Sequence, residues 1–158
     1  MMQVRLARLN EIDEVLDMAA ADVAETRPSI EFDRDRAASI FFRYMADANP
    51  TIYVIDDEGD LIGFGLAWFN QYSFAYGHFL SPEVLYVRPE KRGTRAAALL
   101  LKHIVNEAIR LDVEEIIGGN DNGFNSDRTA RFLEHFGFKR VGYSLRWTND
   151  SPIRRRRR

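Results

Sequence analysis

The stretch that decides the fold is VLYVRPEKRGTRAAALLLKH, residues 84–103. Its first part is β-branched and aromatic, which favours a strand, and its last part is rich in Ala and Leu at helical spacing. Between the two parts lie Pro89, Gly93 and several cations: Arg88, Lys91, Arg92 and Arg95. We therefore expect a strand that feeds into a helix across a basic junction.

This junction has the chemistry of an anion site. The first N–H groups of a helix have no intrahelical partner, and the helix dipole adds positive character there. Gly93 allows a ligand to approach the backbone, and phosphate is the anion that such a helix start favours. An ordinary helix start with a solvated basic surface is the alternative, and spacing alone favours neither. A Gly-Lys-Ser/Thr triphosphate motif is absent, and one glycine is too few for a dinucleotide fingerprint.

The rest of the chain predicts one α/β domain (α+β in some schemes) over residues 1–150. We expect a mixed central sheet of about six to seven strands flanked by about four helices. In Leu61–Phe69 one face is small, which would let a helix or a ligand approach closely. Strands are expected at 4–9, 51–55, 61–69, 78–88, 115–118 and 138–147, and helices at 11–24, from 33, 94–111 and 126–136.

Composition limits the class of protein. The chain has 158 residues, 46% of them hydrophobic and 29% charged, as in ordinary globular proteins. It has no apolar run that could span a membrane and no apolar segment typical of a signal peptide, so we expect a cytoplasmic protein. Cysteine is absent, which excludes disulfides and a cysteine nucleophile. The Arg154–Arg158 run makes the C-terminus basic and leaves an acidic body, and we expect 151–158 to be a disordered tail.

Four segments carry a resemblance to a known family. VRPEKRGTRAAALLLKHI resembles the cofactor-binding segment of the GNAT superfamily of N-acetyltransferases, with Arg95 where a glycine is usual. VRLARLNEIDEV, LIGFGLAW and SDRTARFLEHFGFKRVGY are similar to the opening strand and helix, the third strand and the closing helix of that family. The R-G-T-R-A-A form is similar to acetyltransferase-like proteins of bacteriophages.

The resemblance implies that acetyl-CoA (CoA) is the co-substrate. It would lie between two splayed parallel strands at the cofactor cleft, with its pantetheine arm along the strand that ends at Val87. Its pyrophosphate would meet the amides of the helix start. The implied cofactor-binding residues are Leu85, Tyr86, Val87, Lys91, Arg92, Gly93, Thr94, Arg95, Ala96, Ala97, Asn125 and Ser126.

The resemblance also assigns catalytic candidates. Glu83 is the candidate general base, and a strand-end surface carboxylate is the equally weighted alternative. Leu133 stands where the family often has a tyrosine that meets the leaving thiolate. Tyr143 is a candidate substitute acid, although a core or surface role is the simpler interpretation. A strand amide at Leu85 or Tyr86 would stabilise the thioester oxygen.

Three functions remain open from sequence. The first is direct acetyl transfer to an amine acceptor, either a small molecule or a protein. The second is a catalytically reduced domain that binds CoA or a partner protein. The third is a nucleic-acid-associated protein that uses the Arg tail, which nothing else in the chain favours. No metal site is expected, because the three histidines show no ligand spacing. The final strand is a candidate for pairing across a homodimer, and no membrane partner is expected.

Overall fold

The computed structural model describes residues 1–119, 123 and 125–150. The chain divides into unit 1, Met1–Gly119, and unit 2, Asn120–Arg158, and each is described by itself. The expected tail, 151–158, lies outside the described residues, and the expectation of one domain over 1–150 stays a prediction.

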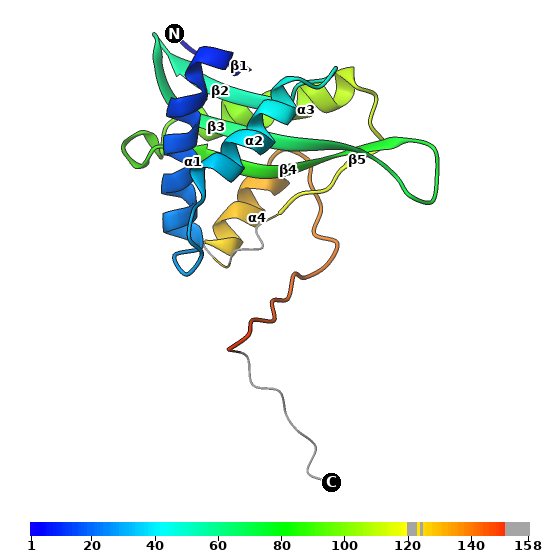
Figure 1. The fold of residues 1–158 in the computed structure, drawn as a ribbon. Coiled ribbons are helices and arrows are strands. Elements are labelled where there is room, and N and C mark those ends of the chain that lie inside the picture. Colours follow the sequence, from blue (N-terminus) through cyan, green and yellow to red (C-terminus); the bar gives the residue numbers. More distant parts are fainter. Residues whose placement is uncertain (120–122, 124, 151–158) are drawn as a thin grey trace. The chain divides into compact units, whose positions relative to one another are not determined.

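Unit 1 contains the whole sheet and three of the helices (Figure 1). Its elements in chain order are β1 (Met2–Leu6), η1 (Leu9–Glu11), α1 (Ile12–Thr26), α2 (Arg34–Met45), β2 (Ile52–Asp57), β3 (Asp60–Gln71), β4 (His78–Val87), η2 (Pro89–Lys91), α3 (Ala96–Arg110) and β5 (Glu115–Ile116). Unit 2 contains α4 (Ser126–Glu134). The order of helices and strands in unit 1 is the one that the sequence predicts.

The sheet has the order β1-β2-β3-β4-β5. The first three pairings are antiparallel and the β4–β5 pairing is parallel, which confirms the predicted mixed sheet. Among the described residues five strands form, rather than the expected six to seven. The missing strand is 138–147, whose residues adopt no strand and in which Val141, Tyr143 and Leu145 are exposed. Alternating apolar residues favour an extended backbone, but a strand also needs a partner edge.

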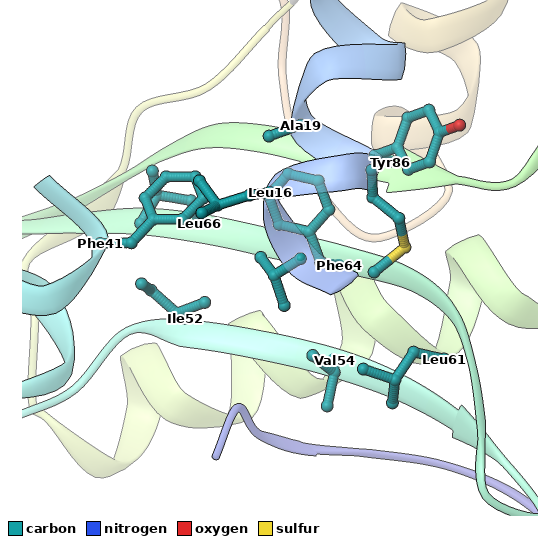
Figure 2. Packing of buried hydrophobic residues seen from close by; sticks show 11 residues of the cluster. Leu16, Ala19, Phe41, Ile52, Val54, Leu61, Phe64, Leu66 and Tyr86 are labelled. Atoms are coloured by element: carbon teal, nitrogen blue, oxygen red, sulfur yellow. The ribbon is translucent and has the colours of Figure 1, made fainter. Parts of the chain in front are cut away.

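Helices cover both faces of this sheet. On one face α1 and α2 pack their apolar residues against β2, β3 and β4, and Figure 2 shows this cluster, which includes Leu16, Phe41, Phe64 and Tyr86. Asp33 caps α2, because its Oδ1 accepts a hydrogen bond from the amide of Arg36 at 2.8 Å. None of the described helices combines the length and the apolar character that a membrane span requires.

The small face of β3 lies against α3. A Cβ built on Gly65 would stand 3.0 Å from the Leu100 side chain of α3, and one built on Gly63 would stand 2.5 Å from the Tyr86 carbonyl oxygen. The predicted close approach is therefore made by a helix and by the neighbouring strand. This close approach holds both β4 and α3 against β3, and it thereby positions the junction between β4 and α3.

Candidate functional site

The junction between β4 and α3 has an open backbone. Gly93 has a φ of +82°, a conformation that L side chains rarely adopt, and no atom lies within 4 Å of a Cβ built there. The glycine therefore serves the conformation of the turn and leaves space above it. This space is what a ligand needs to reach the start of α3.

The first amides of α3 are available. Leu99 makes the first helical hydrogen bond, to the Arg95 carbonyl at 2.9 Å, and the Thr94 hydroxyl accepts the Ala96 N–H at 3.3 Å. The N–H groups of Arg95, Ala97 and Ala98 donate no hydrogen bond to any described residue. The junction thus presents several amide donors beside a positive helix end, as the sequence predicts.

Two of the predicted phosphate-binding cations, Lys91 and Arg92, are engaged elsewhere in the fold. Lys91 Nζ lies 3.3 Å from a carboxylate oxygen of Asp57 at the end of β2. Arg92 Nε donates to the Val87 carbonyl at 2.9 Å, and its terminal nitrogens reach the Glu25 carboxylate of α1 at 2.9 and 3.0 Å. Their charges are largely neutralised by these carboxylates.

Arg88 and Arg95 complete the cations of the junction. The Arg88 side chain donates to the Leu61 carbonyl at 2.8 Å and lies 3.6 Å from Glu14. Arg95 is exposed, and its side chain makes no hydrogen bond or ion pair with any described residue. Of the four cations, Arg95 alone is uncommitted within the described part of the chain.

A carboxylate cluster lies behind Arg92 on α1. Burial and the nearby charge of Glu25 raise the pKa of Asp22 to about 6, and the guanidinium of Arg92 opposes this shift. The Arg92 guanidinium also lies 5.7 Å from the centre of the Tyr86 ring, and burial raises the pKa of Tyr86. This cluster joins the end of β4 to α1 and therefore has a structural role.

Among the described residues, the last part of β4 is paired on one side only, and we call its other side the open edge. The Arg88 amide donates to the Ile62 carbonyl of β3 at 2.8 Å. In an antiparallel pair only every second residue bonds to the neighbouring strand, so the backbone N–H and C=O groups of Leu85 and Val87 point away from β3. On that other side the pairing with β5 ends at Leu80. The parallel strands thus pair only at the beginning of β4, as the predicted splay requires, and the Leu85 N–H and C=O face the open edge.

A β-bulge interrupts β4 at Glu83. Leu66 of β3 pairs with Val84 and the next residue pairs with Pro82, so the register skips Glu83. Such bulges redirect a side chain, so the strand register does not assign Glu83 to either face by simple alternation. The charge of Glu83 contributes to the raised pKa of Tyr44 on α2. No local signal in the sequence relates Tyr44 to Glu83.

The aromatic residues of β3 and of the β3–β4 connection separate into two groups. Trp68 lies on β3 opposite Ser81, two residues from Glu83, and its ring meets Tyr44 edge-on at 5.3 Å. Tyr72, together with exposed Phe74 and Tyr76, lies at the β3–β4 connection, at the opposite end of β4 from the junction (Figure 1). Of these residues, only Trp68 is near Glu83.

The remaining predicted residues belong to unit 2. Asn125 precedes α4 with a φ of +50°, and Ser126 is its first residue. Tyr143 is exposed and Leu133 is buried. Their predicted roles stay predictions. Within residues 1–119, 123 and 125–150, no group of three or more acidic or histidine side chains is placed to hold a metal ion.

Comparisons with known proteins agree with this arrangement. Residues 48–140 match the family model of the acetyltransferase (GNAT) domain. A search of curated protein sequences finds no significant match. Among solved structures, a transcriptional regulator from Bacillus halodurans C-125 matches with a TM-score of 0.78 and 18% identity, over 94% of this chain and 99% of that one. A predicted acetyltransferase with acetyl-CoA from Clostridium acetobutylicum matches with a TM-score of 0.71 and 20% identity, over 94% and 96%. The ribosomal-protein-alanine N-acetyltransferase from Brucella melitensis matches with a TM-score of 0.69 and 15% identity, over 94% and 99%. At these identities the likeness shows the fold.

Proposed function

Because the chain belongs to the GNAT acetyltransferase family, we propose that it transfers the acetyl group of acetyl-CoA directly to an amine acceptor. The observation that supports the proposal is the β-bulge at Glu83 on β4, the strand that leads to the free amides of α3. The Glu83 carboxylate, the open edge of β4 and the amides at the start of α3 therefore follow one another along the chain.

The residues of the junction fit acetyl-CoA. The amides of Arg95, Ala97 and Ala98 suit a pyrophosphate, and the space above Gly93 allows it to approach. Leu85 offers an N–H and a C=O for the amides of the pantetheine arm. When bound, acetyl-CoA supplies an acetyl group that is activated as a thioester.

Glu83 removes a proton from the acceptor in this proposal. A primary ammonium has a pKa of about 10.4, so it is protonated at neutral pH and must lose a proton before its nitrogen can attack. The nitrogen then bonds to the acetyl carbon, the carbon–sulfur bond breaks, and the second nitrogen proton leaves to the thiolate or to water. The Leu85 N–H is the better of the two proposed donors to the thioester oxygen, because the Tyr86 N–H belongs to the ladder with β3.

Arg95 adds a cation to the phosphate site. Its backbone amide can serve the pyrophosphate whatever its side chain is, and its guanidinium has no competing partner among the described residues. It therefore replaces the close approach that a glycine would give with a charge-assisted contact.

Calorimetric titration with acetyl-CoA, followed by an amine screen for CoA release, tests the proposal. Glu83→Gln is expected to lower kcat by about 10²- to 10⁴-fold while acetyl-CoA affinity stays unchanged, because only proton transfer is lost. Glu90→Gln, an exposed carboxylate of η2, is the matched control and should retain activity. Absence of acetyl-CoA binding at millimolar concentration would refute the enzyme function, and unchanged turnover in Glu83→Gln would remove Glu83 as the base.

A CoA-binding domain without catalysis is the second candidate. Leu133 favours it, because an apolar residue stands where the family often has an acid. A thiolate can leave without an acid, since its conjugate thiol has a pKa of about 8.5, so this substitution does not by itself abolish transfer. Acetyl-CoA binding together with no CoA release from any amine would favour this candidate.

A further inference from the structure

An aromatic pair lies beside Glu83 on the α2 face of the sheet. Tyr44 comes from α2 and Trp68 from β3, with ring centres 5.3 Å apart and ring planes at 67°. The edge-on geometry fixes both rings, and aromatic pairs of this kind are stabilising beyond their burial. Two elements that are distant in sequence thus form one rigid aromatic surface.

Trp68 presents a large part of its ring to the surface. It lies on β3 just beyond the last pair with β2, Ile52–Leu66, and pairs only with Ser81 of β4 among the described strands. Of its surface 40% is exposed, whereas Leu66 and Ala67 before it are buried. An exposed aromatic ring of this size loses the benefit of burial, so its exposure is informative. The surface that it presents is available to a ligand.

The register brings this surface to Glu83. Trp68 pairs with Ser81, and Glu83 follows Ser81 by two residues, at the bulge of β4. Residues diagonal to one another across a strand pair lie about 7–8 Å apart, which is within reach of long side chains. The charge of Glu83 contributes to the raised pKa of Tyr44, as expected of a carboxylate in the neighbourhood of that side chain.

The charges around the pair favour a cation. Burial and the charge of Glu83 raise the pKa of Tyr44 to about 12, Asp47 acts in the same direction, and Arg43 opposes it. The Tyr44 hydroxyl therefore stays protonated, and it makes no hydrogen bond with any described residue. Glu83 and Asp47 thus act on this hydroxyl as negative charges, and Arg43 acts on it as a positive one.

We propose that Tyr44 and Trp68 form the acceptor subsite and select a primary alkylammonium group, with the aliphatic stem on the rings and the ammonium toward Glu83. This inference rests on the proposed acetyl transfer and names its acceptor class. An apolar stem gains from contact with the rings, and a cation gains from their faces. A hydroxylated amine with several hydroxyl groups would lay most of them against the apolar ring faces, which offer no hydrogen bond, and this is costly.

Steady-state kinetics with hexylamine and D-glucosamine test the selection. For the wild type, kcat/KM for hexylamine should exceed that for glucosamine by at least about tenfold. Trp68→Ala should raise KM for hexylamine by about five- to thirtyfold and leave KM for acetyl-CoA unchanged. Trp68→Phe should restore most of the affinity, and Phe74→Ala, an exposed aromatic of the β3–β4 connection, is the matched control. The unchanged KM for acetyl-CoA shows that each variant is folded.

A binding measurement separates this inference from the proposed function. The chain has two tryptophans, so Trp147→Phe leaves Trp68 as the sole indole fluorophore, and hexylamine titrated in the presence of CoA should change its emission. Saturable binding without turnover would support the subsite and refute acetyl transfer. Preferred turnover of glucosamine, or equal effects of Trp68→Ala and Phe74→Ala, would overturn the subsite and leave acetyl transfer standing.

A primary alkylammonium group can belong to a free alkylamine or to a lysine side chain. An Nα-acetylated lysine peptide added to the kinetic series distinguishes them. Higher kcat/KM for the peptide than for hexylamine identifies protein lysine as the source, and the reverse identifies a small amine. Either order supports the alkylammonium class, whereas glucosamine ranking above both overturns it.

Discussion

The Gly93→Ala substitution separates the conformation of the junction from its ability to bind phosphate. Gly93 has a φ of +82° and no atom within 4 Å of a Cβ. A left-handed conformation costs an L residue about 1–2 kcal/mol. The smaller entropy of the unfolded alanine chain offsets about 0.4–1 kcal/mol of this cost. The net loss of about 1 kcal/mol should lower Tm by about 2–4 °C for a chain of this size.

The matched control is Gly59→Ala at the turn between β2 and β3. Gly59 also has a positive φ, +100°, and no atom within 4 Å of a Cβ. The strain and the loss of Tm should therefore be similar. The two positions differ in one respect: only Gly93 borders the free amides of α3.

Calorimetric titration with acetyl-CoA then distinguishes the two variants. A methyl group on Gly93 holds the phosphates away from the amides, and losing one hydrogen bond to a charged group costs about 1.5–3 kcal/mol. The Kd for acetyl-CoA should therefore rise by roughly tenfold to a hundredfold in Gly93→Ala and stay unchanged in Gly59→Ala. Equal affinities in the two variants would refute the assignment of the phosphate site to this junction.

Two further substitutions test the packing and the pH dependence of unit 1. Gly63→Ala should destabilise the fold by more than about 2 kcal/mol, because its Cβ would stand 2.5 Å from the Tyr86 carbonyl oxygen. Gly65→Ala should cost less, since only a leucine side chain is in its way, and urea denaturation that ranked the two equally would contradict this packing. The raised pKa of Asp22, about 6, means that the folded state binds more protons than the unfolded state between about pH 4 and 6, so stability falls as pH rises through this window. Asp22→Asn should therefore be more stable than the wild type at pH 7, by at most about 2–3 kcal/mol and by less where water screens the carboxylate, and the two should converge below pH 4. Unfolding curves that stayed parallel from pH 4 to 7 would rule out this titration.

The sequence predicts the junction well because its signals are local. A β-branched run, Pro89, Gly93 and an Ala/Leu-rich run each have a direct conformational meaning, and together they place the turn and the start of α3 within two residues of their observed positions. The failure at 138–147 has the same origin. Alternation there describes a chain that could pair, but whether a partner edge is offered depends on the rest of the fold.

The bulge at Glu83 could not be predicted from sequence. It arises from a register that differs by one residue between the two halves of β4, and a register depends on the partner strand. Pro82, which cannot donate to a ladder, is the one local hint of an irregularity there. The electrostatic effect of Glu83 on Tyr44 is equally non-local, because the two residues belong to elements that are distant in sequence, β4 and α2.

Two cations of the junction have a different role from the one that their run in the sequence suggests. The run of Lys and Arg suggests that side-chain charge makes the anion site, yet Lys91 is paired with Asp57 and Arg92 with Glu25, acids that are 34 and 67 residues away in sequence. These pairs hold β4 and the turn in place, and they leave the backbone amides and Arg95 to meet an anion. A site built on amides depends on the conformation of the turn more than on its charge. Anion affinity should therefore be more sensitive to Gly93→Ala than to the loss of the Lys91 charge, and the family's usual glycine at position 95 can be replaced by arginine without removing the donors.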